Sequence, residues 1–130
     1  KNNGHILNVA SIAGFMPGPL MSTYYATKAY VSSLSRAVAE ELHQKGSHIY
    51  VGCLCPGPVD TEFNNVANVS FALKGISAEY CANYAIDMMK KNKVVIVPTF
   101  RMKFATTCGR FIPQSLYIKI VSHQQKKKLG

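Results

Sequence analysis

A tyrosine and a lysine four positions apart, Tyr24 and Lys28, are the two residues of this chain best suited to chemistry together. On a helix, residues i and i+4 share one face, so the phenol and the ammonium group can meet at one site. A neighbouring positive charge favours the phenolate and makes the hydroxyl a usable proton donor and acceptor near neutral pH. Tyr25 and Tyr30 have no lysine four residues later. The alternative interpretation of the pair is amphipathic packing with a solvated amine.

Two other segments of the sequence, one before this pair and one after it, are informative because of their residue types and their spacing from it. The strand-like run Ile-Leu-Asn-Val-Ala at residues 6–10 leads directly into Ser11, thirteen residues before Tyr24. A second strand-like run is followed by Cys-Pro-Gly-Pro-Val-Asp-Thr at residues 55–61. The order Asn-Val-Ala-Ser, then Tyr-x-x-x-Lys, then Pro-Gly-x-Val-x-Thr resembles the short-chain dehydrogenase/reductase family.

The resemblance implies a catalytic role for three residues. Tyr24 would be the general acid/base that exchanges a proton with the substrate oxygen while hydride moves to or from nicotinamide. Lys28 would bind the nicotinamide ribose and activate the tyrosine. Ser11 would donate a hydrogen bond to the substrate oxygen as charge develops on it. Without the resemblance, Ser11 would be read as a serine that ends a strand.

Four residues of the 55–61 segment would complete the cofactor site in the same resemblance. Pro56 and Gly57 would shape the turn. Val59 through its main chain and Thr61 through its hydroxyl would meet the nicotinamide carboxamide. Thr61 is also a suitable helix cap, and the two roles are compatible.

The segments around these residues predict a βαβ unit. We expect a strand over residues 4–10, a helix capped by Ser22 and running to about Gln44, and a second strand over residues 48–54. The apolar face of the helix would consist of Val31, Leu34, Val38 and Leu42. Such a unit has parallel strands, and ligands bind beyond their carboxyl ends. This rule alone predicts that Ser11 and the loop from Pro56 to Thr61 lie side by side.

The rest of the chain predicts a short helix from Asp60 or Thr61 to residue 74, a helix starting at Ser77 and a buried strand over residues 93–98. We therefore expect an α/β fold, and the resemblance implies a partial Rossmann-like, doubly wound parallel sheet. The Gly-rich dinucleotide fingerprint of the family is absent, as are the amino-terminal βαβ units that carry it. We expect residues 1–98 to be the catalytic half of such a domain, and residues 99–130 to be a basic, apolar carboxyl-terminal extension.

The charge distribution narrows the choice of partners. The chain carries 15 Lys and Arg against 6 Asp and Glu, and every acid lies at or before Asp87. A basic end of this kind suits nucleic acid, an anionic membrane surface or a solvated face. The aliphatic and aromatic residues between the cations favour membrane contact, and no nucleic-acid partner is expected.

The cysteines show no paired metal-binding spacing. Cys53 and Cys55, with His48 nearby, could suggest a metal ligand set, but both lie in or just after an apolar strand. Buried, reduced thiols are the favoured interpretation, and no metal site is expected.

The resemblance implies an NAD(P)-dependent oxidoreductase that interconverts a carbonyl and a secondary alcohol, with NADP slightly favoured over NAD. Its small, apolar substrate would lie against Phe15, Met16, Leu20 and Met21. The protein would be cytoplasmic with peripheral membrane contact, and a homodimer or homotetramer when complete. The alternative is a truncated, non-catalytic family member that serves as an interaction or membrane-surface module.

Overall fold

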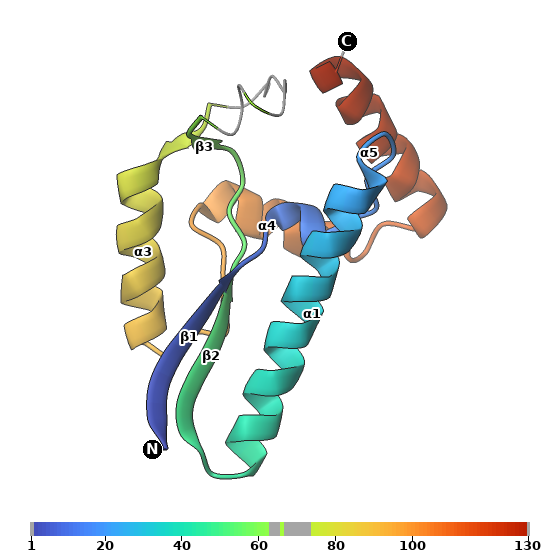
Figure 1. Cartoon of the computed structure of the whole chain (residues 1–130). Coiled ribbons are helices and arrows are strands. Elements are labelled where there is room, and N and C mark those ends of the chain that lie inside the picture. The colour runs from blue at the N-terminus through green and yellow to red at the C-terminus, as the bar shows by residue number, and fades with distance from the viewer. Residues whose placement is uncertain (1, 63–65, 67–73, 130) are drawn as a thin grey trace.

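The computed structural model describes residues 2–62, 66 and 74–129. A three-stranded parallel sheet in the order β1-β2-β5 runs through the molecule, and β3 pairs with β4 in a second, two-stranded parallel sheet (Figure 1). The predicted α/β class with parallel strands is confirmed. The elements are β1 (Asn3–Val9), the 3-10 helix η1 (Ile12–Phe15), α1 (Ser22–Gln44), β2 (His48–Leu54), β3 (Val59–Asp60), β4 (Ile76–Ser77), α3 (Ala78–Lys90), β5 (Val95–Ile96), α4 (Phe100–Gly109) and α5 (Gln114–Leu129).

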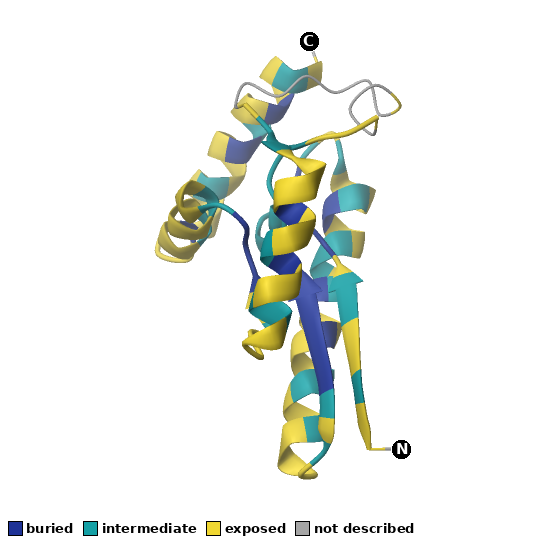
Figure 2. Cartoon of the chain, turned by 90° about the vertical axis from the view of Figure 1, so that its left-hand side faces the viewer, coloured by how far each residue is buried: buried dark blue, intermediate teal, exposed yellow. Residues whose placement is uncertain are grey.

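The central strand, β2, is covered on both faces. Cys53, together with Cys55 just beyond the strand, packs in a cluster that Val31 of α1 joins, whereas Leu54 packs with residues of α3. Successive side chains of a strand point to opposite faces, so a strand between two layers needs a continuous apolar run. Figure 2 shows the resulting contrast between the buried β2 and its more exposed neighbour β1.

The helix α1 has the predicted length but a different start. Ser22 is its first helical residue, and Met21 occupies the cap position without a side-chain hydrogen bond. The prediction that Ser22 caps the helix is therefore wrong by one residue. The preceding loop turns at Leu20, which has φ of 70°, a left-handed conformation that is costly for leucine.

The buried face of α1 agrees with the prediction only in part, because Val31, Val38 and Leu42 are half-buried as expected. Ser32 and Ser35 are buried, whereas Leu34 remains 45% exposed. Serine is small enough to let α1 approach the sheet closely, and its hydroxyl can be satisfied locally. Ser35 donates to the carbonyl of Val31 at 2.7 Å and accepts from Asn8 of β1 at 2.9 Å. These bonds attach α1 to β1.

The chain beyond β5 forms two helices that the sequence analysis did not resolve. They are separated near Gly109 and Pro113, the two breaks seen in the sequence. Met102 of α4 packs on the cluster around Cys53, and Val121 of α5 packs with Tyr25 of α1. Among the residues that the structure describes, no helix is long and apolar enough to cross a bilayer.

The remaining predicted elements have mixed outcomes. Ser77 caps α3 as expected, with its hydroxyl accepting from the amide of Tyr80 at 3.2 Å. The third strand is present but short, because only residues 95–96 pair with β2. The helix expected up to residue 74 falls largely outside the described residues.

Candidate active site

The carboxyl ends of β1 and β2 bring Ser11 against the loop that starts at Pro56. The two strands pair in parallel with Val9 opposite Leu54, so both chains leave the sheet at the same edge. The amide of Ile12 donates to the carbonyl of Pro56 at 3.0 Å, and the Ser11 hydroxyl donates to the same oxygen at 3.4 Å. The side-by-side arrangement predicted from the rule for parallel sheets is confirmed.

The Ser11 oxygen is fixed in position, but the direction of its O–H bond is only weakly constrained. Its Oγ accepts from the amide of Ala13 at 3.1 Å, and the residue is 9% exposed. Its donation to Pro56 is longer than the 2.5–3.0 Å usual for hydroxyl donors, so this bond is weak. The proton can therefore turn toward another acceptor at little cost.

Tyr24 and Lys28 lie on one face of α1, as their spacing predicts. The Lys28 ammonium nitrogen is 5.7 Å from the centroid of the Tyr24 ring, within the range of a cation–π contact. The same nitrogen donates to the carbonyl of Val9 at 3.3 Å. Because an ammonium group has three donors, this bond holds Lys28 at the end of β1 and leaves it further donor capacity.

A close backbone contact sets the distance between the Ser11 segment and the Tyr24 helix. A Cβ added to Gly14 would lie 2.7 Å from the carbonyl oxygen of Lys28 and 3.1 Å from the amide nitrogen of Ala29. Only glycine lets η1 approach α1 this closely. This contact therefore fixes the position of the segment that carries Ser11 relative to the helix that carries Tyr24 and Lys28.

Tyr25, the neighbouring phenol, has a structural role. It is 8% exposed, and its hydroxyl accepts a hydrogen bond from the buried side-chain amide of Gln125 on α5. Burial, followed by the proximity of Tyr24 and Tyr117, raises the pKa of Tyr25 above its ordinary value, so it stays protonated near neutral pH. The sequence gives no signal for the contact with Gln125, because the two residues are 100 positions apart.

The predicted cofactor loop is anchored at both ends. Val59 lies in β3 opposite Ile76, and the amide of Ile76 donates to the carbonyl of Pro58 at 3.1 Å. Met102 of α4 lies over Gly57, where an added Cβ would be 3.0 Å from its Cγ. The extension beyond residue 98 thus supports this loop directly.

The polar groups at this edge suit the nicotinamide end of a dinucleotide. Ser11 and Lys28 supply a hydroxyl and an ammonium group at the carboxyl end of β1, and the exposed Thr61 follows directly after β3. These are hydrogen-bonding groups of the kind that a ribose and a carboxamide require. No group of three His, Cys, Asp or Glu within the described part of the chain could hold a metal ion.

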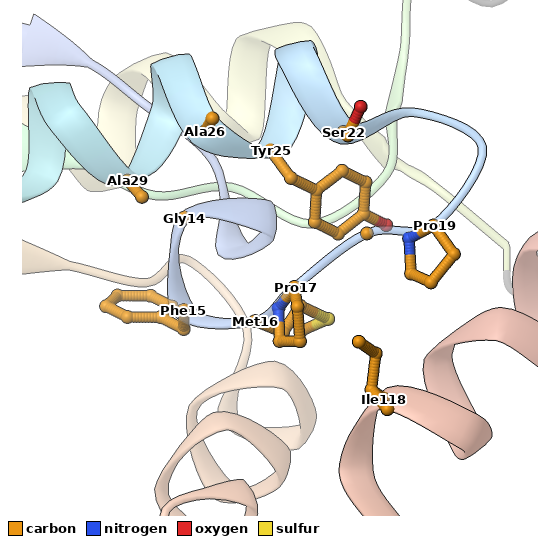
Figure 3. Close-up of a pocket in the computed structure, with 11 residues that line it drawn as sticks. Gly14, Phe15, Met16, Pro17, Pro19, Ser22, Tyr25, Ala26, Ala29 and Ile118 are labelled. Atoms are coloured by element: carbon orange, nitrogen blue, oxygen red, sulfur yellow. The ribbon is translucent and has the colours of Figure 1, made fainter. Parts of the chain in front are cut away.

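An apolar pocket of about 540 Å³ lies between the loop before α1, one face of α1 and α5. In Figure 3, Tyr25 reaches from α1 toward this loop, and Ile118 of α5 faces it from the other side. Its lining residues include Phe15 and Met16 but not Leu20 or Met21. The substrate contact expected of these four residues stays a prediction.

The thiols of Cys53 and Cys55 are fully buried and face each other at 3.4 Å. Both are free cysteines, in agreement with the favoured interpretation. The neighbouring Cys53 thiol and burial raise the pKa of Cys55, which therefore remains a neutral thiol. The pair acts as core packing between the sheet and α1.

Comparison with known proteins gives a consistent result. A family model described as "short chain dehydrogenase" matches residues 1–70. An uncharacterized oxidoreductase of Bacillus subtilis, YvrD, is 48% identical over 62 residues, which are 48% of this chain and 23% of that protein. A short-chain dehydrogenase from Sphingobium yanoikuyae, solved in complex with NADPH, superposes with a TM-score of 0.69 at 29% identity, covering 88% of this chain and 45% of the other.

A structure of a 7beta-hydroxysteroid dehydrogenase superposes with a TM-score of 0.76 at 22% identity and shares the fold. The match covers 92% of this chain and 46% of that one. The chain thus spans about half the length of the solved proteins it resembles, and a smaller share of the curated relative above.

Proposed function

Because the chain belongs to the short chain dehydrogenase family, we propose that it carries the catalytic half of an NAD(P)-dependent oxidoreductase that interconverts a carbonyl and a secondary alcohol. The observation that carries this proposal is the convergence of Ser11, Tyr24 and Lys28 at one edge of the parallel sheet. Two hydroxyls and a cation in that place can stabilise and protonate an oxygen on which negative charge develops.

In the direction of reduction, the Tyr24 hydroxyl gives its proton to the substrate oxygen. The Lys28 ammonium group on the same helix face stabilises the phenolate that remains. The Ser11 hydroxyl turns from its long bond to Pro56 and donates to the substrate oxygen, which lowers the energy of the developing alkoxide. In the direction of oxidation the same groups act in reverse.

The nicotinamide cofactor supplies or accepts the hydride when it is bound. Lys28 would hold its ribose, and the loop with Pro56, Gly57, Val59 and Thr61 would hold its carboxamide. Solved family structures in complex with NADP, NADPH and NAD support a nicotinamide cofactor in general. We propose NADP as the slightly favoured form.

Substitution of Tyr24 by phenylalanine tests this function. In the protein of full natural length, Tyr24→Phe removes the proton donor and keeps the ring, so NADPH-dependent reduction of apolar ketones should fall by roughly 10²–10⁴-fold. Tyr30→Phe is the matched control, because Tyr30 lies on the same helix, is 67% exposed and should leave turnover unchanged. Wild-type turnover of Tyr24→Phe at unchanged stability would favour the non-catalytic alternative.

We also propose that the complete protein assembles as a homodimer or homotetramer through α1. Its outward face exposes Tyr30 at 67% and Leu34 at 45%, four residues apart, beside the small Ala26 and Ala37. Apolar side chains next to alanines suit close helix–helix packing. A monomeric mass by light scattering at micromolar concentration would contradict this assembly.

A further inference from the structure

The outer face of α4 exposes two phenylalanines that the fold does not use. Phe100 is 82% exposed and Phe104 is 63% exposed. They are four residues apart, so they form one apolar stripe along the helix. Phe111, just beyond the helix, is 85% exposed. We refer to Phe100 and Phe104 as the α4 stripe.

The face of α4 opposite the α4 stripe already packs against the rest of the protein. Met102 lies against the core cluster and Gly57, and Gly109 is buried against Tyr117. Thr106 lies between them, half-buried, and donates to the carbonyl of Met102 at 2.9 Å. These spacings of four and three residues define the inner side of the helix. The α4 stripe is therefore a second apolar face, directed away from the body of the protein.

Cations flank the α4 stripe on both sides. At about 100° per residue, Arg101 and Lys103 lie roughly 80° to either side of the midline between the two phenylalanines. Both are exposed, as is Arg110 at the helix end. No acidic residue occurs in the sequence after Asp87. The surface thus combines aromatic rings with positive charge that no neighbouring acid on this segment neutralises.

The place of α4 in the fold argues against two other occupants. In Figure 2, α4 lies on the side of the sheet away from β1, one of the two outer strands in the order β1-β2-β5. A piece of a family domain that extends the sheet from β1 would therefore dock away from α4. A second copy packed on the α4 stripe by two-fold symmetry would bring the cations of the two helices together with no acid on either segment to pair with them, which is unfavourable.

We propose that the α4 stripe binds an anionic phospholipid surface, with Phe100 and Phe104 in the interface and Arg101 and Lys103 at the lipid phosphates. Aromatic side chains partition into the boundary between headgroups and acyl chains. Basic side chains beside them are attracted by the negative surface potential. The membrane contact expected from the sequence for the basic extension, residues 99–130, is thus assigned to one face of α4.

Vesicle co-sedimentation of the protein at full natural length tests this proposal. Vesicles of phosphatidylglycerol and phosphatidylcholine should bind the wild type at low salt, and vesicles of phosphatidylcholine alone should bind it more weakly. Phe100→Ser with Phe104→Ser should lower the affinity roughly tenfold or more for each ring. Arg101→Gln with Lys103→Gln should lower it roughly fivefold for each charge and reduce its salt dependence.

Matched controls lie on the exposed surface of α3 and at its end. Tyr80→Ser removes an aromatic side chain that is 50% exposed, and Lys90→Gln with Lys91→Gln removes two exposed cations. These variants should bind vesicles like the wild type, and all variants should keep the wild-type melting temperature.

Three results would overturn the proposal. The first is unchanged vesicle binding by the phenylalanine variant. The second is a large loss of thermal stability in that variant, which would mean that the rings are buried in the complete protein. The third is a loss of oligomer mass in the variant without vesicles, which would identify the α4 stripe as a subunit interface. None of these results depends on turnover, so they are distinguishable from failure of the proposed reaction.

Discussion

Substitution of Gly14 by alanine tests whether the contact between η1 and α1 sets the geometry of the site. The added Cβ would lie 2.7 Å from the Lys28 carbonyl oxygen, about 0.7 Å closer than the 3.4 Å at which ordinary contacts begin. The atoms it meets belong to the backbone of α1 and cannot rotate away. Accommodation therefore requires η1 and α1 to separate.

The expected cost has two parts. Overpacking of this kind lowers the free energy of unfolding by about 1–3 kcal/mol. Separation of η1 from α1 also moves Ser11 relative to Tyr24, and a misplacement near 1 Å can cost about 100-fold in rate. A shift of about 0.7 Å should thus lower kcat/KM by roughly tenfold or more, although Ser11, Tyr24 and Lys28, the proposed catalytic residues, are all still present.

Gly4→Ala is the matched control, because a Cβ at Gly4 in β1 would meet nothing within 4 Å. That variant should be neutral or slightly more stable. Urea unfolding and steady-state kinetics on both variants of the full-length protein measure the two effects. Wild-type stability and wild-type kcat/KM in Gly14→Ala would refute the reasoning.

Three further predictions follow from the local environment of single residues. Tyr25→Phe removes the acceptor of the Gln125 amide and should lower the free energy of unfolding by about 1–3 kcal/mol in urea titrations, whereas adding Gln125→Leu should recover part of the loss. Leu20→Asn should raise stability by about 1 kcal/mol, because asparagine tolerates the left-handed conformation at this exposed position; no change in the melting curve would argue against strain there. Iodoacetamide should label the exposed Cys108 in the folded protein, as peptide mass mapping would show, and should reach three buried thiols only after unfolding: Cys53, Cys55 and Cys81.

The parts of the site that could be predicted depend on short spacings and on one rule of sheet geometry. Tyr24 and Lys28 meet because four residues make about one turn, and Ser11 meets Pro56 because parallel strands end at the same edge. Neither relation requires knowledge of distant packing.

The parts that could not be predicted depend on how the last third of the chain folds back. Met102 over Gly57 and Gln125 beneath Tyr25 join positions 45 and 100 residues apart, and no local pattern encodes such pairs. The exposure of Leu34 and the burial of Ser35 on α1 could not be predicted for a different reason. A prediction from apolar periodicity assigns leucine rather than serine to the buried face of a helix. The close approach of helix and sheet instead favours the smaller Ser35 and leaves Leu34 exposed.

The unpaired edge of β1 determines what kind of partner could assemble with this chain in a two-part form of the protein. Ile6 is 52% exposed and Val9 is 59% exposed. They are three residues apart on a strand, so they point to opposite faces of the sheet. A single added strand would satisfy the backbone of β1 but would leave both side chains exposed to water. A partner that completes this edge would therefore need a strand together with a covering layer on each face, which makes the β1 edge a suitable junction for a two-part, split form of the protein.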